Sequence, residues 1–575
     1  MGGAAASTGG RRLGAGLRAT GARIERGLEQ VDRLRPSYVV AFFVVAEWVA
    51  VAALALVVRH NHWVYYQGGD QLWSYTSGWL LGQGKLASPL VGYLWGALLA
   101  PLTWIAGPNL VGAYPVILVV DTVVLLPLAL ASLYGLARLI AGRRFAVLAL
   151  AVWLAAPFVG ILLTNAGYHQ RYTELILPQA FGLTAMTDFP TMVAALVAAY
   201  FTARVLFDGR DAALDALAAG VAAGAAIGIK PSTALFLAGP ALALAFARRL
   251  GAIGLFLAGL LPALVTLTLW KWRGYGYLPV LHGSVGAPTR SAAGETVALG
   301  VPHYARFDWA HFERQLDLLR EHFWSGRLIE WLVVAGLIAI GLRSRRALAL
   351  VGGWFVAFAV VKGGYGQASI EDSSLLRILI PTIPAFVLLL AALPYLVPRE
   401  GRPWPAVEPS ARAPRRWRLA ALGAVLLVTA VVPFAAIAAA TPIGADDPPA
   451  VVIQQPLIPA SVDLGVTTTR DGDHVTISWN AVHSAGGAVF YHVFRAPTDG
   501  SALDCDTDSP AVVCQYKATD LGATPLTTFT DTPPKGGDFE YRVGVSANWL
   551  NDPTLGDVYE LSRSSSSSDS SSANR

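Results

Sequence analysis

Residues 37–58 read SYVVAFFVVAEWVAVAALALVV, an apolar run that contains a single acid. An α-helix needs about 20 such residues to cross a hydrocarbon layer that is roughly 30 Å thick. Comparable runs recur as far as residue 440, and only 14% of the 575 residues are charged, whereas soluble domains average about 25%. The pattern predicts a polytopic α-helical membrane protein, with its transmembrane domain over residues 37–440.

The placement of the arginines predicts the orientation. Residues 1–36 form a basic segment with seven arginines, and cytoplasmic segments of membrane proteins are rich in such residues. The apolar segment Pro89–Ala106 decides on which side the later arginine clusters lie. If it crossed the membrane, most of them would lie outside, whereas a helix in the interface leaves them all inside. We therefore expect an interfacial helix there, a cytoplasmic N-terminus and an extracytoplasmic C-terminus. The eleven predicted spans are 37–58, 110–137, 144–163, 190–207, 212–229, 232–248, 252–271, 328–342, 347–362, 375–396 and 419–440.

The composition changes after residue 440, where a Pro-rich linker over 441–456 begins. Three segments beyond it alternate with period two and predict strands: His474–Trp479, Val489–Arg495 and Phe539–Val545. On these segments, region 457–555 resembles a fibronectin type III module, which implies an all-β sandwich outside the membrane.

The two cysteines of the chain, Cys505 and Cys514, both lie in this outer region. Two close cysteines outside the membrane predict a disulfide in an oxidising compartment. The Ser-rich end, residues 556–575, cannot bury apolar surface and is predicted to be disordered.

A polar and aromatic stretch follows the first span: residues 65–71 read YYQGGDQ and continue to Lys85. We expect a loop on the outer face here, with Asp70 as a catalytic acid or base. Asp188, before Phe189-Pro190 at the start of the fourth span, is a second candidate. An acid at such a position is also a good N-cap, and the two roles are compatible.

Four of the six lysines stand at predicted outer ends of helices, against the bias that fixes orientation: Lys85, Lys230, Lys271 and Lys362. A negatively charged ligand at the outer face would favour them there, and the alternative is that they snorkel to the interface. Lys230 is the strongest candidate, because it lies in the turn GIKPS (228–232) between two short helices.

Arg377 enters the tenth span and is either an interfacial anchor or a clamp for a phosphate. The other residues expected to line the same outer cavity are His169, Arg171, Tyr365 and Glu371, with hydrogen bonding within its loop as the alternative for His169. Asp121, inside the second span, is predicted to bond another helix.

There is no HExxH, cysteine cluster or phosphate-cradling glycine motif, so no metal site is predicted and a metalloprotease or ATPase is not expected.

Taken together, these features resemble the GT-C superfamily of integral-membrane glycosyltransferases, which includes protein mannosyltransferases and aminoarabinose transferases. The matching features, over residues 37–396, are the acid Asp70 in the first outer loop, the interfacial segment after it, Asp188 with Pro190, the Gly-x-Lys-Pro turn at Lys230, and Arg377 before Pro381 and Pro384. The family usually has an acid pair in the first loop, whereas Gln71 follows Asp70 here. That difference leaves the subfamily and any dependence on a divalent metal open.

The resemblance implies transfer of a sugar from a polyprenyl-phosphate donor, without a cofactor, at the outer face of the cytoplasmic membrane. Asp70 would take the proton from the hydroxyl of a glycan, lipid or protein acceptor, with inversion at the anomeric carbon. Lys230 and Arg377 would stabilise the departing phosphate, and Asp188 would orient the acceptor or the base. Membrane lipids are expected partners and nucleic acid is not. The competing functions are a transporter or flippase of lipid-linked glycans and a membrane anchor that presents the outer module for adhesion.

Overall fold

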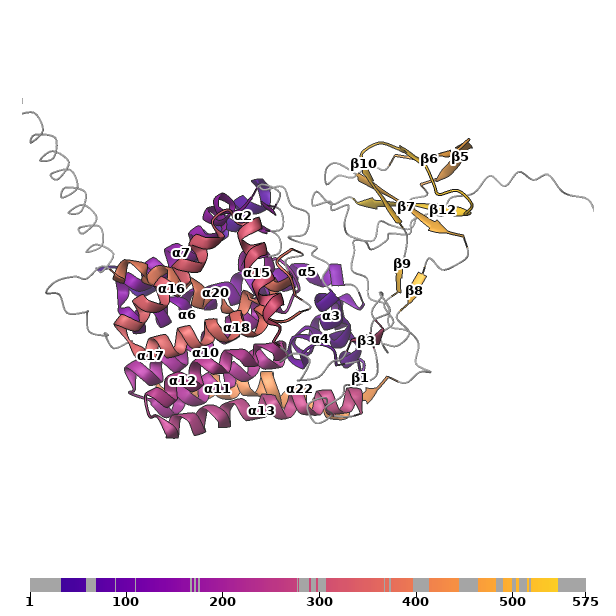
Figure 1. Cartoon of the computed structure of the whole chain (residues 1–575). Helices are drawn as coiled ribbons and strands as arrows, with labels where there is room; N and C mark the ends of the chain where they lie inside the picture. The colour runs from indigo at the N-terminus through magenta and orange to yellow at the C-terminus, as the bar shows by residue number, and fades with distance from the viewer. Residues whose placement is uncertain are drawn as a thin grey trace, which may run out of the picture.

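The computed structural model describes a helical part that ends near residue 440 and a strand-containing part beyond it (Figure 1). The described residues are 33–57, 69–87, 89–108, 110–165, 168–169, 172–173, 176–276, 278, 289–290, 296–297, 307–366, 368–371, 374–396, 413–443, 464–481, 490–498, 503–505, 514–516 and 519–546. Most of the basic segment 1–36, most of the linker 441–456 and the tail 556–575 lie outside them, so those predictions are not tested.

The helical part consists of α-helices interrupted by short 3-10 and π turns (η). Its elements are α2 (Pro36–Val57), α3 (Gly69–Gly82), α4 (Tyr93–Ala106), α5 (Leu110–Val119), η1 (Val120–Leu125), α6 (Leu126–Ala141), α7 (Arg143–Leu163), α9 (Pro178–Phe181), α10 (Asp188–Ala203), η3 (Arg204–Asp208), α11 (Ala212–Ile229), η4 (Pro231–Leu237), α12 (Ala238–Phe246), α13 (Leu250–Tyr275), α15 (Trp309–His322), α16 (Gly326–Arg343), α17 (Arg345–Ala347), η5 (Leu348–Gly352), α18 (Gly353–Gly363), α19 (Ser374–Ile378), η6 (Ile380–Thr382), α20 (Ile383–Ala392), η7 (Leu393–Leu396), α21 (Arg415–Leu426), η8 (Leu427–Val431) and α22 (Val432–Ala439).

Eight helices among the described residues are long and apolar enough to cross a membrane, and the chain is a multi-pass membrane protein. A ninth candidate is the pair α15 and α16, which is bent by 116°. The predicted number of eleven spans is not confirmed. Two predicted spans, 232–248 and 375–396, fall on the shorter helical stretches Pro231–Phe246 and Ile380–Leu396, where prolines favour 3-10 turns because they lack a backbone N–H donor.

The polar stretch after the first span is not a loop over its whole length, because residues 69–82 form helix α3. Four of its polar side chains are buried: Gln71, Ser74, Thr76 and Ser77. The hydroxyl of Tyr114 in α5 donates to Oε1 of Gln71 at 2.9 Å. A helix therefore forms where the polar composition predicted a loop, and the buried hydroxyls of Ser74, Thr76 and Ser77 have no hydrogen-bond partner among the described residues.

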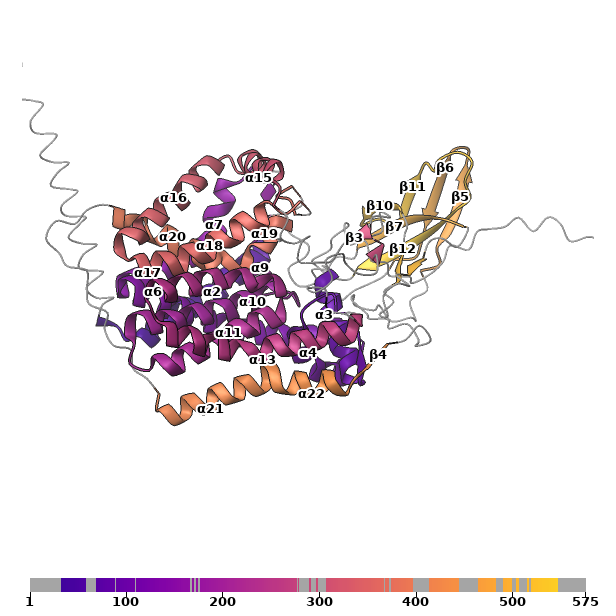
Figure 2. The same cartoon turned by 60° about the horizontal axis from the view of Figure 1, so that its bottom comes forward.

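Helices α3 and α4 pack through glycines and lie side by side at one end of the helical part (Figures 1 and 2). A Cβ atom added to Gly78 would lie 2.5 Å from the carbonyl oxygen of Gly96, so the two backbones touch. Helix α4 has 14 residues, or about 21 Å at 1.5 Å per residue, which is shorter than a hydrocarbon layer of roughly 30 Å. The interfacial placement of 89–106 stays a prediction.

Small residues also bring α11 and α13 together. A Cβ on Gly220 would lie 2.0 Å from the carbonyl oxygen of Phe256, and one on Gly259 would lie 2.3 Å from that of Leu217. In a membrane, such close backbone approach gains van der Waals contact that larger side chains would prevent.

Asp121 does not bond another helix as predicted. It lies in the π turn η1 and is fully buried. Neither of its carboxylate oxygens has a hydrogen-bond partner among the described residues.

The outer part contains two three-stranded sheets, in the orders β11-β6-β5 and β10-β7-β12. Their strands are β5 (Thr467–Asp471), β6 (His474–Ser478), β7 (Phe490–Pro497), β10 (Thr519–Thr524), β11 (Thr528–Asp531) and β12 (Phe539–Ser546). Strands β6, β7 and β12 lie where the alternation predicts them. Short strand pairs join β1 (Lys85–Leu86) to β4 (Thr441–Pro442), β2 (Thr289–Arg290) to β3 (Thr296–Val297), and β8 (Leu503–Cys505) to β9 (Cys514–Tyr516).

One apolar cluster draws on both three-stranded sheets and includes Ile477, Val493 and Val543. The hydroxyl of Tyr541 donates to Asp531 at 2.8 Å, and Asp531 pairs with Arg495 at 2.9 Å. Burial and the Asp531 carboxylate raise the pKa of the Tyr541 phenol, which keeps it a neutral donor. The similarity to fibronectin type III modules stays a prediction.

The positions of the two cysteines are compatible with a disulfide. Cys505 and Cys514 stand directly opposite each other in the β8–β9 ladder. Opposite residues of an antiparallel pair have Cα atoms about 4.5–5.5 Å apart, within the roughly 4.4–6.8 Å that a disulfide spans. The bond itself remains a prediction.

The α3–α4 contact predicts a specific cost of adding volume. We expect Gly78→Val to lower the stability of the detergent-solubilised protein by about 1–3 kcal/mol, because overpacking forces the backbones apart. The same substitution at Gly254, where an added Cβ meets nothing within 4 Å, is the control and should have little effect. Thermal unfolding followed by intrinsic fluorescence measures both, and equal losses would contradict the packing described.

Candidate functional site

Three residues that the sequence singles out separately meet at one end of the helical part. Asp188 is the first residue of α10, Lys230 ends α11, and Arg377 lies in α19. Nζ of Lys230 donates to Oδ1 of Asp188 at 2.7 Å, and Nε of Arg377 lies 3.7 Å from Oδ2 of the same carboxylate. The Asp188 side chain is 0% exposed, whereas Lys230 and Arg377 keep 16% and 21% of their side-chain surface. We call these three residues the charge cluster.

The local sequence explains why these side chains stand at helix ends. Proline disfavours the helical conformation of the residue before it. Lys230 precedes Pro231 and is extended, with φ −136° and ψ 102°. Asp188 does not act as the N-cap, since Thr187 holds that position and no side-chain capping bond is present there. The Asp188 carboxylate instead contacts the two cations, although an acid in the first turn still favours the helix dipole.

Lys362 adds a further positive charge close to the charge cluster. It is buried at the end of α18, and its ammonium group repels that of Lys230. Its Nζ lies 4.9 Å from the centre of the Tyr365 ring, so Tyr365 contacts this additional cation.

Helix α4 supports the charge cluster from one side. A Cβ on Gly92 would lie 2.2 Å from the carbonyl oxygens of both Gly228 and Ile229, directly before Lys230. The indole N–H of Trp95 donates to the carbonyl oxygen of Ala185 at 2.9 Å, shortly before Asp188. The start of α4 therefore packs against both segments that supply the Asp188–Lys230 pair. Sequence reasoning missed these contacts, because nothing in the sequence pairs Gly92 or Trp95 with residues so far along the chain.

Lys271 stabilises the segment leading into α4 instead of joining the charge cluster. Its ammonium group donates to the carbonyl oxygens of Leu90 at 3.4 Å and of Val91 at 3.5 Å, and also contacts that of Pro89. Lys85 lies in strand β1, opposite Thr441. The four outer lysines thus divide into two near Asp188 and two associated with the segment that links α3 to α4.

The position of Asp70 is defined by its backbone, in the first turn of α3; its side chain is outside the described residues. One apolar cluster contains Tyr75 of α3 and Tyr93 of α4, together with Ala185 and Ile229, which lie close to Asp188 and Lys230 in the sequence. Helix α3 therefore packs at the end of the bundle that carries the charge cluster.

Two of the remaining candidates, His169 and Glu371, have contacts with residues outside the charge cluster. Nε2 of His169 is 3.1 Å from the carbonyl oxygen of Thr164, which is hydrogen bonding within its loop. Glu371 pairs with Arg314 at 3.9 Å, and both side chains are largely exposed. Arg171 lies outside the described residues. No group of three or more potential metal ligands occurs among the residues that the structure describes.

Comparisons with known proteins add little to this geometry. No family model matches the chain, and no curated protein matches it. The chain is similar to a solved structure, the oligosaccharyltransferase of Archaeoglobus fulgidus tethered with an acceptor peptide, at 13% identity and a TM-score of 0.34. The match covers 72% of this chain and 56% of that chain. At this identity and TM-score, the likeness carries no argument about this chain's activity.

The Asp188–Lys230 pair predicts strong energetic coupling. We expect Asp188→Asn to destabilise the protein by about 3–5 kcal/mol, because removing one partner leaves a poorly solvated cation uncompensated. The double variant Asp188→Asn/Lys230→Met should lose less than the sum of the single variants, with a coupling of about 0.5–3 kcal/mol.

The exposed pair Arg314–Glu371 provides the matched control for this double-mutant cycle. Its side chains are 71% and 62% exposed, and exposed ion pairs contribute little because solvent screens them. We expect no measurable coupling for Arg314→Gln and Glu371→Gln. Chemical denaturation in detergent measures both cycles, and additive losses at Asp188 and Lys230 would refute the pairing.

Proposed function

We propose that the protein is a membrane glycosyltransferase that moves a sugar from a polyprenyl-phosphate donor to an acceptor hydroxyl. The observation that supports this function best is the meeting of Asp188, Lys230 and Arg377 at one end of the bundle. Cationic groups at a helix end suit a substrate whose charged phosphate lies at the membrane surface while its chain stays in the lipid.

In this proposal, Lys230 and Arg377 bind the phosphate that leaves the sugar. Negative charge grows on the departing phosphate in the transition state, and donors that are already in place stabilise it without reorganisation. The planar guanidinium of Arg377 can bind two phosphate oxygens at once, whereas Lys230 supplies a compact charge. Both side chains retain exposed surface through which a ligand can reach them.

The role of Asp188 is inferred from its burial. Its carboxylate is 0% exposed and contacts the two cations, so we assign it the task of positioning Lys230 and Arg377. This differs from orienting the acceptor or the base, the role that the resemblance implies. Asp70 is then the proposed general base, which removes the acceptor proton as the hydroxyl attacks the anomeric carbon with inversion.

Helix α4 gives the donor lipid a route to the charge cluster. Its sequence, YLWGALLAPLTWIA, has no charged residue, and Trp104 and Ile105 are exposed on it. A short apolar helix in the interface leaves room for the lipid chain to approach from the side. We place the charge cluster, α4 and the strand-containing part on the outer face, in line with the arginine distribution.

A transporter of lipid-linked glycans is the second candidate, and two buried acids favour it. Transporters place polar groups near the middle of the membrane, and both Glu47 in α2 and Asp121 in η1 are buried within spans. The charge cluster instead lies where α10 begins and α11 ends. Uptake of a fluorescent lipid-linked glycan into vesicles, without any sugar transfer, would favour the transporter.

The proposed base predicts a large kinetic effect at Asp70. We expect Asp70→Asn to reduce sugar transfer from lipid-phosphate donors by about 10²–10⁴-fold, the range typical of general acid–base catalysis, with normal expression. Transfer in isolated membranes, followed with a radiolabelled sugar, measures it. Undiminished transfer by Asp70→Asn would remove Asp70 from the mechanism.

The proposed phosphate site predicts a different pattern at Lys230 and Arg377. Either residue changed to Gln should lower kcat as well as donor affinity, because the interaction strengthens as the phosphate departs. Arg314→Gln is the matched control, since Arg314 is exposed and contacts Glu371. If kcat stays unchanged in Lys230→Gln and Arg377→Gln, these residues do not stabilise the transition state.

A further inference from the structure

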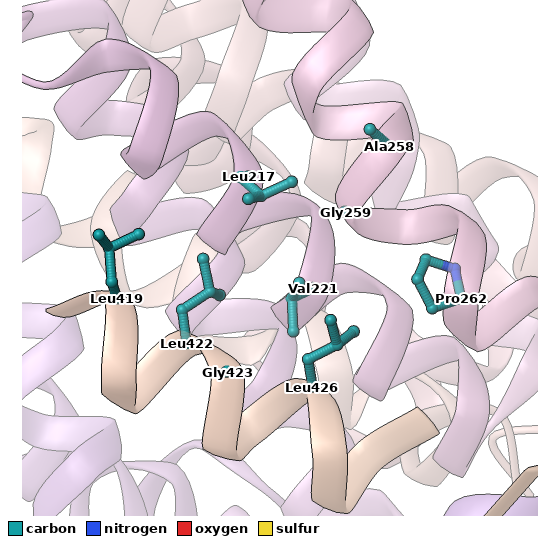
Figure 3. Close-up of a pocket in the computed structure, with 9 residues that line it drawn as sticks. All are labelled: Leu217, Val221, Ala258, Gly259, Pro262, Leu419, Leu422, Gly423 and Leu426. Atoms are coloured by element: carbon teal, nitrogen blue, oxygen red, sulfur yellow. The ribbon is translucent and has the colours of Figure 1, made fainter. Parts of the chain in front are cut away.

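An apolar groove opens between three helices, away from the charge cluster (Figure 3). Helix α11 contributes Leu217 and Val221, while Leu419, Leu422 and Leu426 of α21 face them. Helix α13 completes the lining with Ala258, Gly259 and Pro262, and every residue that lines the groove is apolar.

The first half of the last helix lies at the surface of the bundle. No residue of α21 is buried, whereas Pro433 and Ile437 of α22 are. Figure 2 shows α21 lying along the outside of the other helices. The side chains at Leu419, Leu422 and Leu426 recur at helical spacing, so one apolar stripe of α21 faces a space that this chain does not fill.

The groove has the size of a hydrocarbon ligand. Its volume is about 220 Å³, and an engineered apolar cavity of about 150 Å³ holds benzene. Inside a membrane, the groove has access to hydrocarbon instead of water, and filling it recovers the dispersion contacts that its walls would otherwise lack.

One end of the groove lies at a row of arginines. Helix α21 begins at Arg415, one turn before Leu419, and α13 begins directly after Arg249. A contact of Arg418 with Asp211 brings the start of α21 next to the start of α11. A Cβ on Gly209 would lie 3.9 Å from Nη2 of Arg249, which places the start of α13 at the same end.

These arginines carry positive charge that the nearby acids do not offset. The acids at this end already pair with other arginines: Asp208 with Arg210, Asp211 with Arg418, and Asp215 with Arg204 and Arg418. Among the described residues, no acid forms an ion pair with Arg248, Arg249, Arg415 or Arg416, and all four are exposed.

We propose that this groove binds an anionic phospholipid. One acyl chain lies along Leu419, Leu422 and Leu426, and the phosphate headgroup lies on the arginines at the start of α21 and α13. Basic residues at membrane helix ends attract anionic headgroups, and guanidinium groups bind phosphate oxygens in pairs. The arginine distribution predicts this end to be cytoplasmic, opposite the charge cluster, so this lipid is distinct from the proposed donor.

Lipid binding to the full-length, delipidated protein tests the proposal without any measurement of sugar transfer. Native mass spectrometry would count bound phosphatidylglycerol or phosphatidylcholine, and titration would give each affinity. We expect phosphatidylglycerol to bind at least tenfold more tightly than phosphatidylcholine. The variant R415Q/R416Q should lose most of that preference, a roughly tenfold or larger loss of affinity for the anionic lipid.

Two further variants separate the headgroup contact from the chain contact. Gly423 lines the groove and an added Cβ there meets nothing within 4 Å, so G423F should fill the space and weaken both lipids while the protein still folds. The pair R345Q/R346Q, exposed arginines at the start of α17, is the control and should keep the preference.

Three results would overturn the proposal. The first is equal affinity for the two phospholipids in the wild-type protein. The second is unchanged lipid binding in both R415Q/R416Q and G423F. The third is displacement of phosphatidylglycerol by a polyprenyl phosphate at lower concentration, which would identify the groove as a site for the carrier lipid.

Discussion

A carboxylate buried at the end of a membrane helix requires compensation, and Asp188 receives it from Lys230 and Arg377. Leaving one charge of such a pair without its partner costs several kcal/mol, about 3–5 in typical cases. The three residues come from segments far apart in the sequence, so the pairing requires the start of α10, the end of α11 and α19 to meet at one point. The same pairing leaves two cations with exposed surface on the apolar bundle, which is the property that the proposed reaction uses.

The charge cluster depends on close backbone packing around it. Helix α4 approaches the last residues of α11, Gly228 and Ile229, because Gly92 has no side chain there. Helix α3 approaches α4 through Gly78 and Gly96. Lys271 adds hydrogen bonds to the carbonyl groups at residues 90 and 91. Three glycines and one lysine thus support the charge cluster through close backbone packing and hydrogen bonds.

Some of this arrangement could be predicted from the sequence, because the cost of charge in a membrane leaves few choices. The bias of arginines to one side made the outer lysines conspicuous, and Lys230 and Lys362 do lie near Asp188. Tertiary contacts, in contrast, leave no direct sign in the sequence. Polar composition predicted a loop where α3 is buried against α4, and an interhelical bond for Asp121 that the described structure lacks. Apolar composition also predicted full spans over 232–248 and 375–396. There, prolines introduce 3-10 turns and the helical stretches are shorter than the other candidate spans.

Binding of a water-soluble, short-chain polyprenyl phosphate, compared with the matching alcohol, tests most directly whether the charge cluster is a phosphate site. Isothermal titration with the wild-type protein and with Lys230→Gln/Arg377→Gln would give both affinities. The account predicts that the phosphate binds at least tenfold more tightly than the alcohol, and that the double variant removes this difference. Equal binding of the two ligands by the wild-type protein, or an unchanged preference in a folded double variant, would contradict it.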